Sequence, residues 1–322
     1  MLMLAPHPLV VSIDDGYSSY DQELALLDEI GARFEVRPCK GDEQKVVEAV
    51  EGADVVLVRE SPVTRKVMEA ADRCKGVIRY GIGLDNIDLA AARERHIAVA
   101  NVPDYGVEEV STHAVALLLA VVRQLMPRDE QVRSGRWTSA PSRPMYRLRG
   151  RTLGLIGYGR IARQVHEKLS GFGFSQVLVY DPSADIPASF KSVEIEEICR
   201  HSDVISLHAP LNSQTKHLIN ADRLAMMRPT TIIVNTARGG LIDANALTDA
   251  LRDGHILGAG LDVFESEPPD SSHPIFKLQN VVISDHIGWY SEESMRELQR
   301  KATLEAIQIL SGTPPKNWVN KW

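Results

Sequence analysis

The feature that most constrains the fold is a unit of strand, turn, helix and strand that ends in an acid. Residues 152–182 read TLGLIGYGRIARQVHEKLSGFGFSQVLVYDP. An apolar run leads into the glycine-rich turn Gly157-Tyr158-Gly159, apolar residues then recur at helical spacing, and a second apolar run is closed by Asp181. This order predicts a βαβ unit in a parallel α/β sheet.

Each part of this unit suits a bound dinucleotide. Gly157 permits a tight turn, Gly159 lets the backbone approach a pyrophosphate, and the following helix presents free N–H groups and a positive dipole to the phosphates. Asp181 lies 24 residues after Gly157 and can accept hydrogen bonds from both ribose hydroxyls. Because an acid repels a 2′-phosphate, the predicted cofactor is NAD rather than NADP. The competing interpretation is an ordinary glycine turn in an α/β sheet.

Length, charge and cysteine usage exclude several other classes of protein. A chain of 322 residues suggests about two domains. The net charge of −7 without a basic run argues against direct nucleic-acid binding. Scattered cysteines favour a reducing compartment over a disulfide framework or a metal site; they are Cys39, Cys74 and Cys199. Because no apolar run is long enough for a bilayer and the apolar start suits a first strand better than a signal peptide, the predicted location is the cytoplasm.

Strand and helix signals alternate along most of the chain, which predicts two α/β domains. The first series runs from residue 9 to residue 100, and the second runs from residue 152 to residue 284. Between them we expect a long helix over 107–125, ended by Pro127, and an arginine-rich connection over 133–149. Those arginines could contact phosphates or simply face solvent. A last helix over 291–310 is expected to return across the first domain.

Polar side chains follow three strands of the second series. The predicted strand over 232–234 is followed by Arg238, the next strand by Glu267, and the last strand, over 281–284, by His286. The carboxyl ends of parallel strands meet at one edge of a sheet, where ligands bind. We therefore expect these three side chains beside the nicotinamide.

The trio suits the reduction of a 2-keto acid. Such a reaction needs a hydride at the carbonyl carbon and a proton at its oxygen, and a histidine titrates near neutrality. A neighbouring glutamate stabilises the protonated ring, while an arginine grips the substrate carboxylate and polarises the carbonyl. Taken singly, the histidine could be structural, the glutamate could cap a turn, and the arginine could serve only phosphates.

Five segments together resemble the D-isomer-specific 2-hydroxyacid dehydrogenases. They occur in the order that the family has, and they cover nearly the whole chain. The segments are RYGIGLDNID (79–88), the glycine turn (157–162), VNTARGGLID (234–243), LDVFESEP (261–268) and DHIGW (285–289).

The resemblance implies site residues. Arg238 would bind substrate and polarise its carbonyl, Glu267 would partner the acid, and His286 would be the acid/base. Asp262 would contact the nicotinamide amide. The implied cofactor contacts are Gly157, Tyr158, Gly159, Arg160, Ile161, Asp181, Ala209, Pro210, Thr236, Ala237, Arg238, Asp262 and His286. The implied substrate contacts are Arg79, Gly81, Ile82 and Trp289.

The resemblance also implies the architecture. We expect an α/β fold of two Rossmann-like domains with parallel sheets. A catalytic, flavodoxin-like domain would be discontinuous, comprising residues 1–104 and 291–322, and an NAD-binding Rossmann domain would comprise 105–290. Family members are usually homodimers with the helix near 107–125 in the interface.

One branch of the family is more similar still. The segment HIGWYSEES (286–294) resembles the C-terminal-binding protein corepressors, where a tryptophan lines the substrate pocket. Arg79 stands where that branch has a second carboxylate-binding arginine. By this analogy Trp289 would favour an apolar substrate side chain, although a plain core tryptophan is an equal alternative. Two positions depart from the family pattern: Asp285 replaces a proline, and Ile82 replaces a serine or threonine.

These observations predict an NAD-dependent D-2-hydroxyacid dehydrogenase that acts on a small 2-keto or 2-hydroxy acid and needs no metal, nucleic acid or membrane. Two alternatives remain. One is an NAD(H)-sensing binding module resembling the corepressors, and the other is an enzyme resembling 3-phosphoglycerate dehydrogenase.

Overall fold

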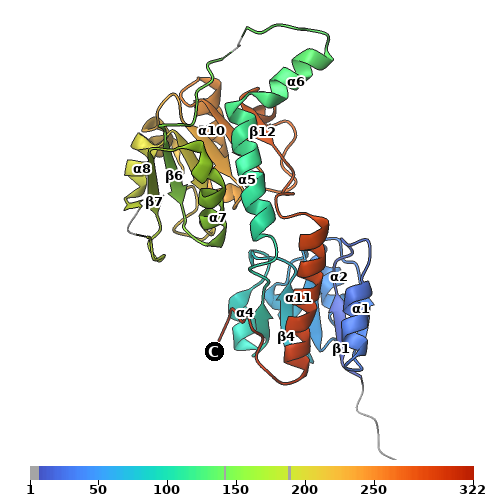
Figure 1. Ribbon diagram of the computed structural model, residues 1–322. Helices are drawn as coiled ribbons and strands as arrows, with labels where there is room; N and C mark the ends of the chain where they lie inside the picture. The colour runs from blue at the N-terminus through green and yellow to red at the C-terminus, as the bar shows by residue number, and fades with distance from the viewer. Residues whose placement is uncertain (1–6, 141–142, 188–189) are drawn as a thin grey trace, which may run out of the picture. The chain divides into compact units, whose positions relative to one another are not determined.

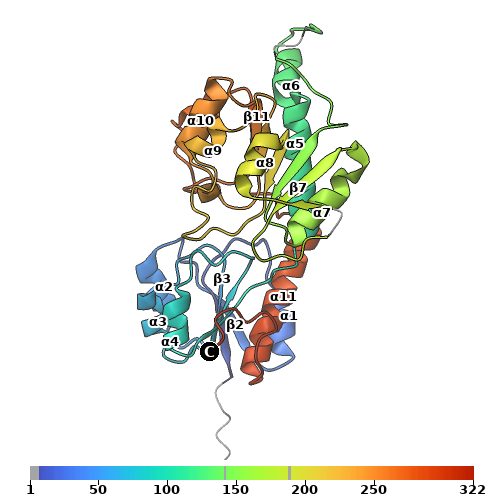
Figure 2. The same cartoon turned by 90° about the vertical axis from the view of Figure 1, so that its left-hand side faces the viewer.

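A computed structural model of the chain describes residues 7–140, 143–187 and 190–322. The chain divides into two compact units, and each is treated by itself below. Unit 1 comprises the chain up to Gly106 together with Ser291–Trp322, and unit 2 comprises Val107–Tyr290. Figures 1 and 2 show the elements of both units from two directions.

Unit 1 is a five-stranded parallel sheet in the order β2-β1-β3-β4-β5, the order of the flavodoxin-like fold. In Figure 2, α2, α3 and α4 cover one face, and α1 and α11 cover the other. The strands are β1 (Leu9–Ser12), β2 (Arg33–Val36), β3 (Val55–Val58), β4 (Gly76–Arg79) and β5 (Ala98–Ala100). The helices are α1 (Asp21–Asp28), α2 (Glu43–Ala49), α3 (Arg65–Ala70), α4 (Leu89–Glu94) and α11 (Glu292–Leu310).

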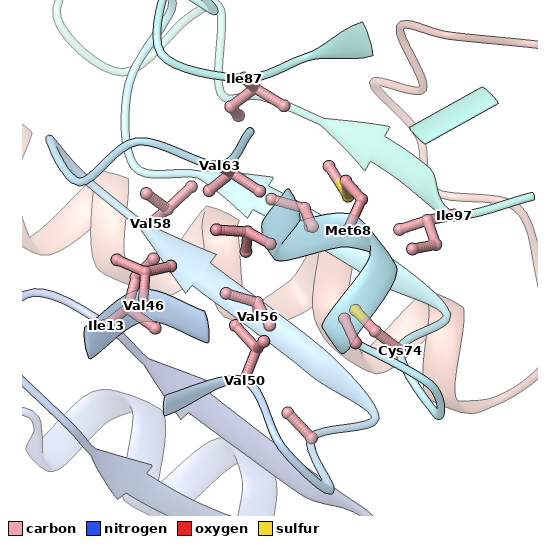
Figure 3. Close-up of a cluster of buried hydrophobic side chains, with 14 of the residues drawn as sticks. Ile13, Val46, Val50, Val56, Val58, Val63, Met68, Cys74, Ile87 and Ile97 are labelled. Carbon is pink, nitrogen blue, oxygen red and sulfur yellow. The ribbon is translucent and has the colours of Figure 1, made fainter. Parts of the chain in front are cut away.

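Local sequence explains these elements. The central strand β3 is VVLV and is buried throughout, as expected for a parallel strand covered on both faces. Figure 3 shows its Val56 and Val58 among Val46 of α2 and Met68 of α3. Asp42 is the N-cap of helix α2, and its carboxylate accepts hydrogen bonds from two backbone N–H groups of the first turn.

The last helix returns to the first domain, where α11 packs against α1 and β4. Gly76 permits this contact, because a Cβ there would lie 2.3 Å from Cδ1 of Ile309. A polar contact anchors the same helix, since Nε2 of Gln299 donates to the Glu23 carboxylate of α1 at 3.0 Å. The chain therefore builds unit 1 from its two ends.

Unit 2 is a seven-stranded parallel sheet in the order β12-β11-β10-β9-β6-β7-β8. The order reverses between β6 and β9, which is the switch point of a Rossmann sheet. The strands are β6 (Thr152–Ile156), β7 (Gln176–Tyr180), β8 (Lys191–Ser192), β9 (Val204–Leu207), β10 (Ile232–Asn235), β11 (Gly258–Leu261) and β12 (Val281–Ile283). The α-helices are α5 (Val107–Val122), α6 (Leu125–Arg133), α7 (Arg160–Leu169), α8 (Ile195–His201), α9 (Ala221–Ala225) and α10 (Ala244–Arg252).

Two hydrophobic cores fill the two faces of the unit 2 sheet. One core packs under α8, α9 and α10, and the other packs under α5 and α7. The predicted α/β class with two parallel, Rossmann-like sheets is confirmed.

The prediction for the helix after residue 107 was partly wrong. Helix α5 ends at Val122, and a second helix, α6, runs on at an angle of 62° and contains Pro127. Gln124 makes the break, with a left-handed φ of 49°. Pro127 does not stop a helix here, because it lies in the first turn of α6, where its missing N–H would have no intrahelical partner. The predicted connection is otherwise confirmed. Residues 134–140 and 143–151 form no helix or strand, and residues 141–142 are not described.

No single helix in the described ranges has the length and apolar character to cross a membrane, although α5 and α6 together pass by length and composition. The predicted first strand is observed as β1, while residues 1–6 of the apolar start lie outside the described part.

Candidate active site

The turn after β6 leaves room for a ligand at the amino end of α7. Gly157 has a φ of +86°, and a Cβ there would lie 2.7 Å from the backbone nitrogen of Ala209. Gly159 differs, because among the described residues nothing would lie within 4 Å of its Cβ. Gly159 is the N-cap of α7 and offers no side chain to the first N–H groups. A pyrophosphate fits this open end of the helix.

Asp181 lies at the end of β7, beside that turn. Its Oδ2 accepts the N–H of Tyr158 at 2.7 Å, and its Oδ1 accepts the N–H groups of Ser183 and Ala184. Burial raises the pKa of the Asp181 carboxyl, but these hydrogen bonds outweigh burial and hold that pKa below its ordinary value. The carboxylate is therefore charged at neutral pH and keeps acceptor capacity for a ribose.

The loops after β9 and β10 supply further predicted cofactor residues. Ala209 and Pro210 follow β9, where Ala209 contacts the Gly157 turn. The hydroxyl of Thr236, after β10, is buried and finds no hydrogen-bond partner within the described ranges. A buried hydroxyl without a partner is costly, so this group suits a ligand hydrogen bond.

The predicted substrate arginine follows the same strand. Nη1 of Arg238 donates to the carbonyl of Ala237 at 2.7 Å, and the Asn235 side chain donates to the Arg238 carbonyl at 2.9 Å. Gly239 is required next, because a Cβ there would lie 1.9 Å from the backbone of Phe264. The loops after β10 and β11 therefore touch, which brings Arg238 close to the loop that carries Glu267.

Glu267 and His286 form a direct pair. Nδ1 of His286 lies 2.6 Å from Oε2 of Glu267, whose other oxygen accepts the N–H of Phe264 at 3.0 Å. Burial raises the pKa of the Glu267 carboxyl, but the hydrogen bonds and the charge of Arg238 outweigh burial and lower that pKa. The structure thus brings the predicted trio together at the carboxyl edge of the unit 2 sheet.

Asp262 is more engaged with protein than the sequence predicts. Its carboxylate accepts hydrogen bonds from Ser284 Oγ at 2.6 Å and from the N–H groups of Ile287 and Gly288 at 3.1 and 3.0 Å. Nε2 of His113, on α5, lies 3.3 Å from the same carboxylate. Sequence reasoning missed Ser284 and His113. The sequence signal that could have identified His113 is its i, i+4 spacing from buried residues of α5.

In unit 1, three of the predicted substrate residues lie at the end of β4 or just after it: Arg79, Gly81 and Ile82. The guanidinium of Arg79 donates to the carbonyl of Tyr80. Gly81 has a φ of +146°, and its N–H donates to the Arg79 carbonyl at 2.9 Å. The carbonyl of Ile82 accepts a hydrogen bond from the Asn101 amide at 2.7 Å.

The remaining predicted substrate residue, Trp289, lies in unit 2. Its indole packs edge-on against the Tyr290 ring, with centroids 5.6 Å apart.

The sequence analysis did not identify two further candidate residues of unit 1, Tyr17 and Arg59. They follow β1 and β3, between which the strand order reverses, and the Arg59 guanidinium lies 5.8 Å from the centre of the Tyr17 ring. The Tyr17 hydroxyl is buried without a hydrogen-bond partner in the described part of the chain. Burial raises the pKa of Tyr17, against the lowering effect of the Arg59 and Arg79 charges. The signal was their position after two adjacent strands at a switch point.

Comparisons with known proteins agree with this fold. A family profile described as "D-isomer specific 2-hydroxyacid dehydrogenase, NAD binding domain" matches residues 115–288. The chain is 38% identical over 277 residues to a glyoxylate reductase of Thermococcus litoralis, covering 83% of each chain. It is 37% identical over 273 residues to a hydroxypyruvate reductase of Thermotoga maritima, covering 83% of this chain and 87% of that one.

It is also 37% identical over 310 residues to a D-3-phosphoglycerate dehydrogenase of Methanocaldococcus jannaschii, covering 94% of this chain but 58% of that longer protein. Among solved structures, the TT0316 protein of Thermus thermophilus superposes with a TM-score of 0.88 at 34% identity, over 97% of this chain and 99% of that one. A D-lactate dehydrogenase of Aquifex aeolicus, complexed with NAD and lactic acid, superposes with a TM-score of 0.86 at 25% identity, over 98% and 99%.

Proposed function

The chain belongs to the D-isomer specific 2-hydroxyacid dehydrogenase family, which makes it an NAD-dependent oxidoreductase of the CH–OH group, and we propose the following substrate class and site residues. The substrate is a small 2-keto acid, reduced to the D-2-hydroxy acid. The observation that carries this proposal is the 2.6 Å contact of His286 with Glu267, on the sheet edge that also holds Arg238.

The chemistry follows from the two ends of the imidazole. Bound NADH supplies the hydride that the carbonyl carbon receives. His286, protonated and held through Nδ1 by Glu267, donates the proton on its other nitrogen to the carbonyl oxygen. The Arg238 guanidinium binds the substrate carboxylate and stabilises negative charge that develops on the oxygen. In the oxidation direction the same imidazole accepts the hydroxyl proton.

Specific groups would hold the cofactor. The turn at Gly157–Gly159 and the amino end of α7 take the pyrophosphate, and the Asp181 carboxylate takes the ribose. Among the residues that the structure describes, the space beside Gly159 is open and the Thr236 hydroxyl has no hydrogen-bond partner, and both observations support this assignment.

The test is His286→Ala. We expect turnover to fall by about 10²–10⁴-fold, the usual contribution of a general acid/base, while the dissociation constant of NADH changes less than about twofold. The matched control is His217→Ala, because His217 also pairs with a glutamate, Glu265, at 3.1 Å but on a neighbouring loop. If the turnover of His286→Ala is close to that of His217→Ala, His286 is not the acid/base.

A second substrate class has its own supporting observation. Against the larger raising effect of burial, the charges of Arg59 and Arg79 both lower the pKa of the buried Tyr17. The carboxyl edge of the unit 1 sheet therefore carries two cations. Two cations suit a keto acid with a second anionic group, such as 3-phosphohydroxypyruvate. We expect Arg59→Gln to raise the KM of that substrate about tenfold and to leave the KM of glyoxylate unchanged. Equal effects on both substrates would argue for the small, singly charged class.

The corepressor-like branch is a finer proposal, based on the HIGWYSEES segment and on Arg79. If Trp289 contacts the substrate side chain, Trp289→Val should shift preference toward bulkier 2-keto acids, measured as ratios of kcat/KM. An unchanged preference would make Trp289 a packing residue. For the binding-module alternative, the supporting result would be inactivity on a full keto-acid panel together with a stable protein partner.

The proposed assembly is a homodimer. The apolar residues of α5 are mostly buried inside unit 2, whereas α6 and the segment after it expose apolar side chains to solvent: Leu125, Met126, Val132 and Trp137 are 57%, 53%, 50% and 89% exposed. A second copy of the chain is the proposed cover for this surface. We expect Val132→Asp to halve the mass measured by light scattering at micromolar concentration; a monomeric wild type would refute the proposal.

The proposed compartment is the cytoplasm. Cys39, Cys74 and Cys199 are all buried free thiols, as expected in a reducing environment.

A further inference from the structure

Helix α5 packs directly against strand β11, and two glycines make this possible. A Cβ on Gly258 would lie 2.7 Å from Cγ1 of Val121, and a Cβ on Gly260 would lie 2.8 Å from Cβ of Leu117. Any larger residue at either strand position would push the helix away. The register is regular, because four helical residues rise about 6 Å and two strand residues advance about 6.6 Å.

The next step of the same register joins His113 to Asp262. His113 lies one turn before Leu117 on α5, and Asp262 lies two residues after Gly260 along the strand direction. Nε2 of His113 is 3.3 Å from the Asp262 carboxylate. The apolar contacts between helix and strand therefore determine where the His113 side chain reaches.

His113 also contacts Ser284, which follows β12. The Ser284 hydroxyl donates its single proton to Asp262 Oδ1 at 2.6 Å, and Nε2 of His113 lies 2.7 Å from the same hydroxyl oxygen. Because that proton is already given to the carboxylate, the oxygen accepts a hydrogen bond from the Nε2–H of His113. His113, Ser284 and Asp262 thus form one connected network.

Asp262 in turn holds the loop that carries His286. Its carboxylate accepts the N–H groups of Ile287 and Gly288, and its carbonyl accepts the N–H of His286 at 2.8 Å. The His286 backbone is left-handed, with a φ of +58°, which is uncommon for a residue with a side chain. The approach is tight, since a Cβ on Gly288 would lie 2.7 Å from Oδ2 of Asp262. These bonds fix the direction in which the His286 side chain leaves the loop.

We propose that His113 is a positioning residue for the acid/base His286: through Ser284 and Asp262 it holds the 286–288 loop in its left-handed conformation and so aims the imidazole. This inference rests on the proposed role of His286. It makes α5 a support of the reacting group as well as a core helix.

The test compares His113→Leu with His113→Gln. Leucine has no donor, whereas the glutamine amide nitrogen reaches the position of Nε2. We expect His113→Leu to lower kcat about tenfold, with the KM of the keto acid and the NADH dissociation constant within about twofold. His113→Gln should restore kcat to within about threefold of wild type. The matched control is Leu118→Ala, a buried residue of α5 outside the row formed by His113, Leu117 and Val121, which should lower the melting temperature and leave kcat unchanged.

A second readout does not depend on turnover. Amide hydrogen exchange at Ile287 and Gly288 should accelerate about tenfold in His113→Leu and stay near wild type in His113→Gln. If wild type reduces no 2-keto acid, the proposed function fails and exchange still tests the network. Should His113→Leu not fold, Ser284→Ala removes the same link and should lower kcat and accelerate exchange.

Three outcomes would overturn the inference. They are wild-type kcat in His113→Leu, equal losses of kcat in His113→Leu and His113→Gln, or equal losses in His113→Leu and Leu118→Ala.

Discussion

Nδ1 of His286 lies 2.6 Å from Oε2 of Glu267, although 19 residues of chain separate them. The contact assigns different roles to the two ring nitrogens, since one is held by a carboxylate and the other is left for chemistry. It also places an anion where a protonated imidazole needs it.

Glu267→Gln tests the charge of this pair. We expect kcat to fall about 10²-fold, because the amide keeps the size of the side chain but no longer stabilises the protonated ring. The pKa of Glu267 is lowered in the folded protein. The stability that its ionised carboxylate contributes is therefore complete above the ordinary pKa of 4.5 and is lost only as pH falls through the lowered value. Glu267 is therefore ionised at pH 7, where the kcat values of wild type and variant are compared.

Glu265→Gln is the control, because Glu265 lies on the same loop as Glu267 but pairs with His217, which is on another loop. If Glu265→Gln reduces kcat as much as Glu267→Gln does, the loop rather than the charged pair is responsible.

Gly157 and Gly159 should respond oppositely to alanine. Gly157→Ala places a Cβ 2.7 Å from the backbone after β9 at a φ of +86°, so we expect about 2 kcal/mol or more of lost stability. Gly159→Ala meets nothing within 4 Å among the described residues, so stability should change by less than about 1 kcal/mol. Instead, NADH should bind about tenfold more weakly because the methyl fills the space for the pyrophosphate.

Urea denaturation and NADH fluorescence titration measure the two effects. Unchanged NADH affinity in a folded Gly159→Ala variant would contradict the assignment of the pyrophosphate to this turn.

Asp181→Ala should weaken NADH binding about tenfold and reduce the preference for NADH over NADPH, because the ribose loses an acceptor and the 2′-phosphate loses a repelling charge. The measurement is kcat/KM for both cofactors. Asp185→Ala is the control, since Asp185 is exposed four residues further along. Cofactor preference equal to wild type in Asp181→Ala would contradict the ribose assignment.

Glu23→Gln tests a buried carboxyl in unit 1. Burial raises the pKa of Glu23 above its ordinary value of 4.5, against the lowering effect of hydrogen bonds from Tyr80 and Gln299. A raised pKa means that this group's contribution to stability is full below 4.5 and is lost as pH rises through the folded value. Glutamine cannot ionise, so the variant should gain stability relative to wild type as pH rises from 4.5 to 8.

Urea denaturation across that pH range is the measurement. Glu29→Gln, at the exposed end of α1, should show no such trend. A difference between Glu23→Gln and wild type that does not change with pH would show that Glu23 remains ionised when folded.

Sequence alone determined the elements whose signals are local. The unit that ends at Asp181 was predictable because strand, turn and helix periodicities follow from backbone geometry. The convergence of Arg238, Glu267 and His286 was predictable too, because each follows a parallel strand and such strands end at one edge. The position of the break before α6 was not predictable from Pro127, since a proline in a first turn and a proline after a last turn look alike in sequence.

Only the tertiary structure decided which distant residues share a contact. Arg59 meets Tyr17 because β1 and β3 are neighbours in the sheet, although 42 residues separate the two side chains. His113 reaches Asp262 because Gly258 and Gly260 let one helix lie against one strand in one register. Such contacts depend on which elements pack together, and that choice is made by the whole core rather than by any local stretch of chain.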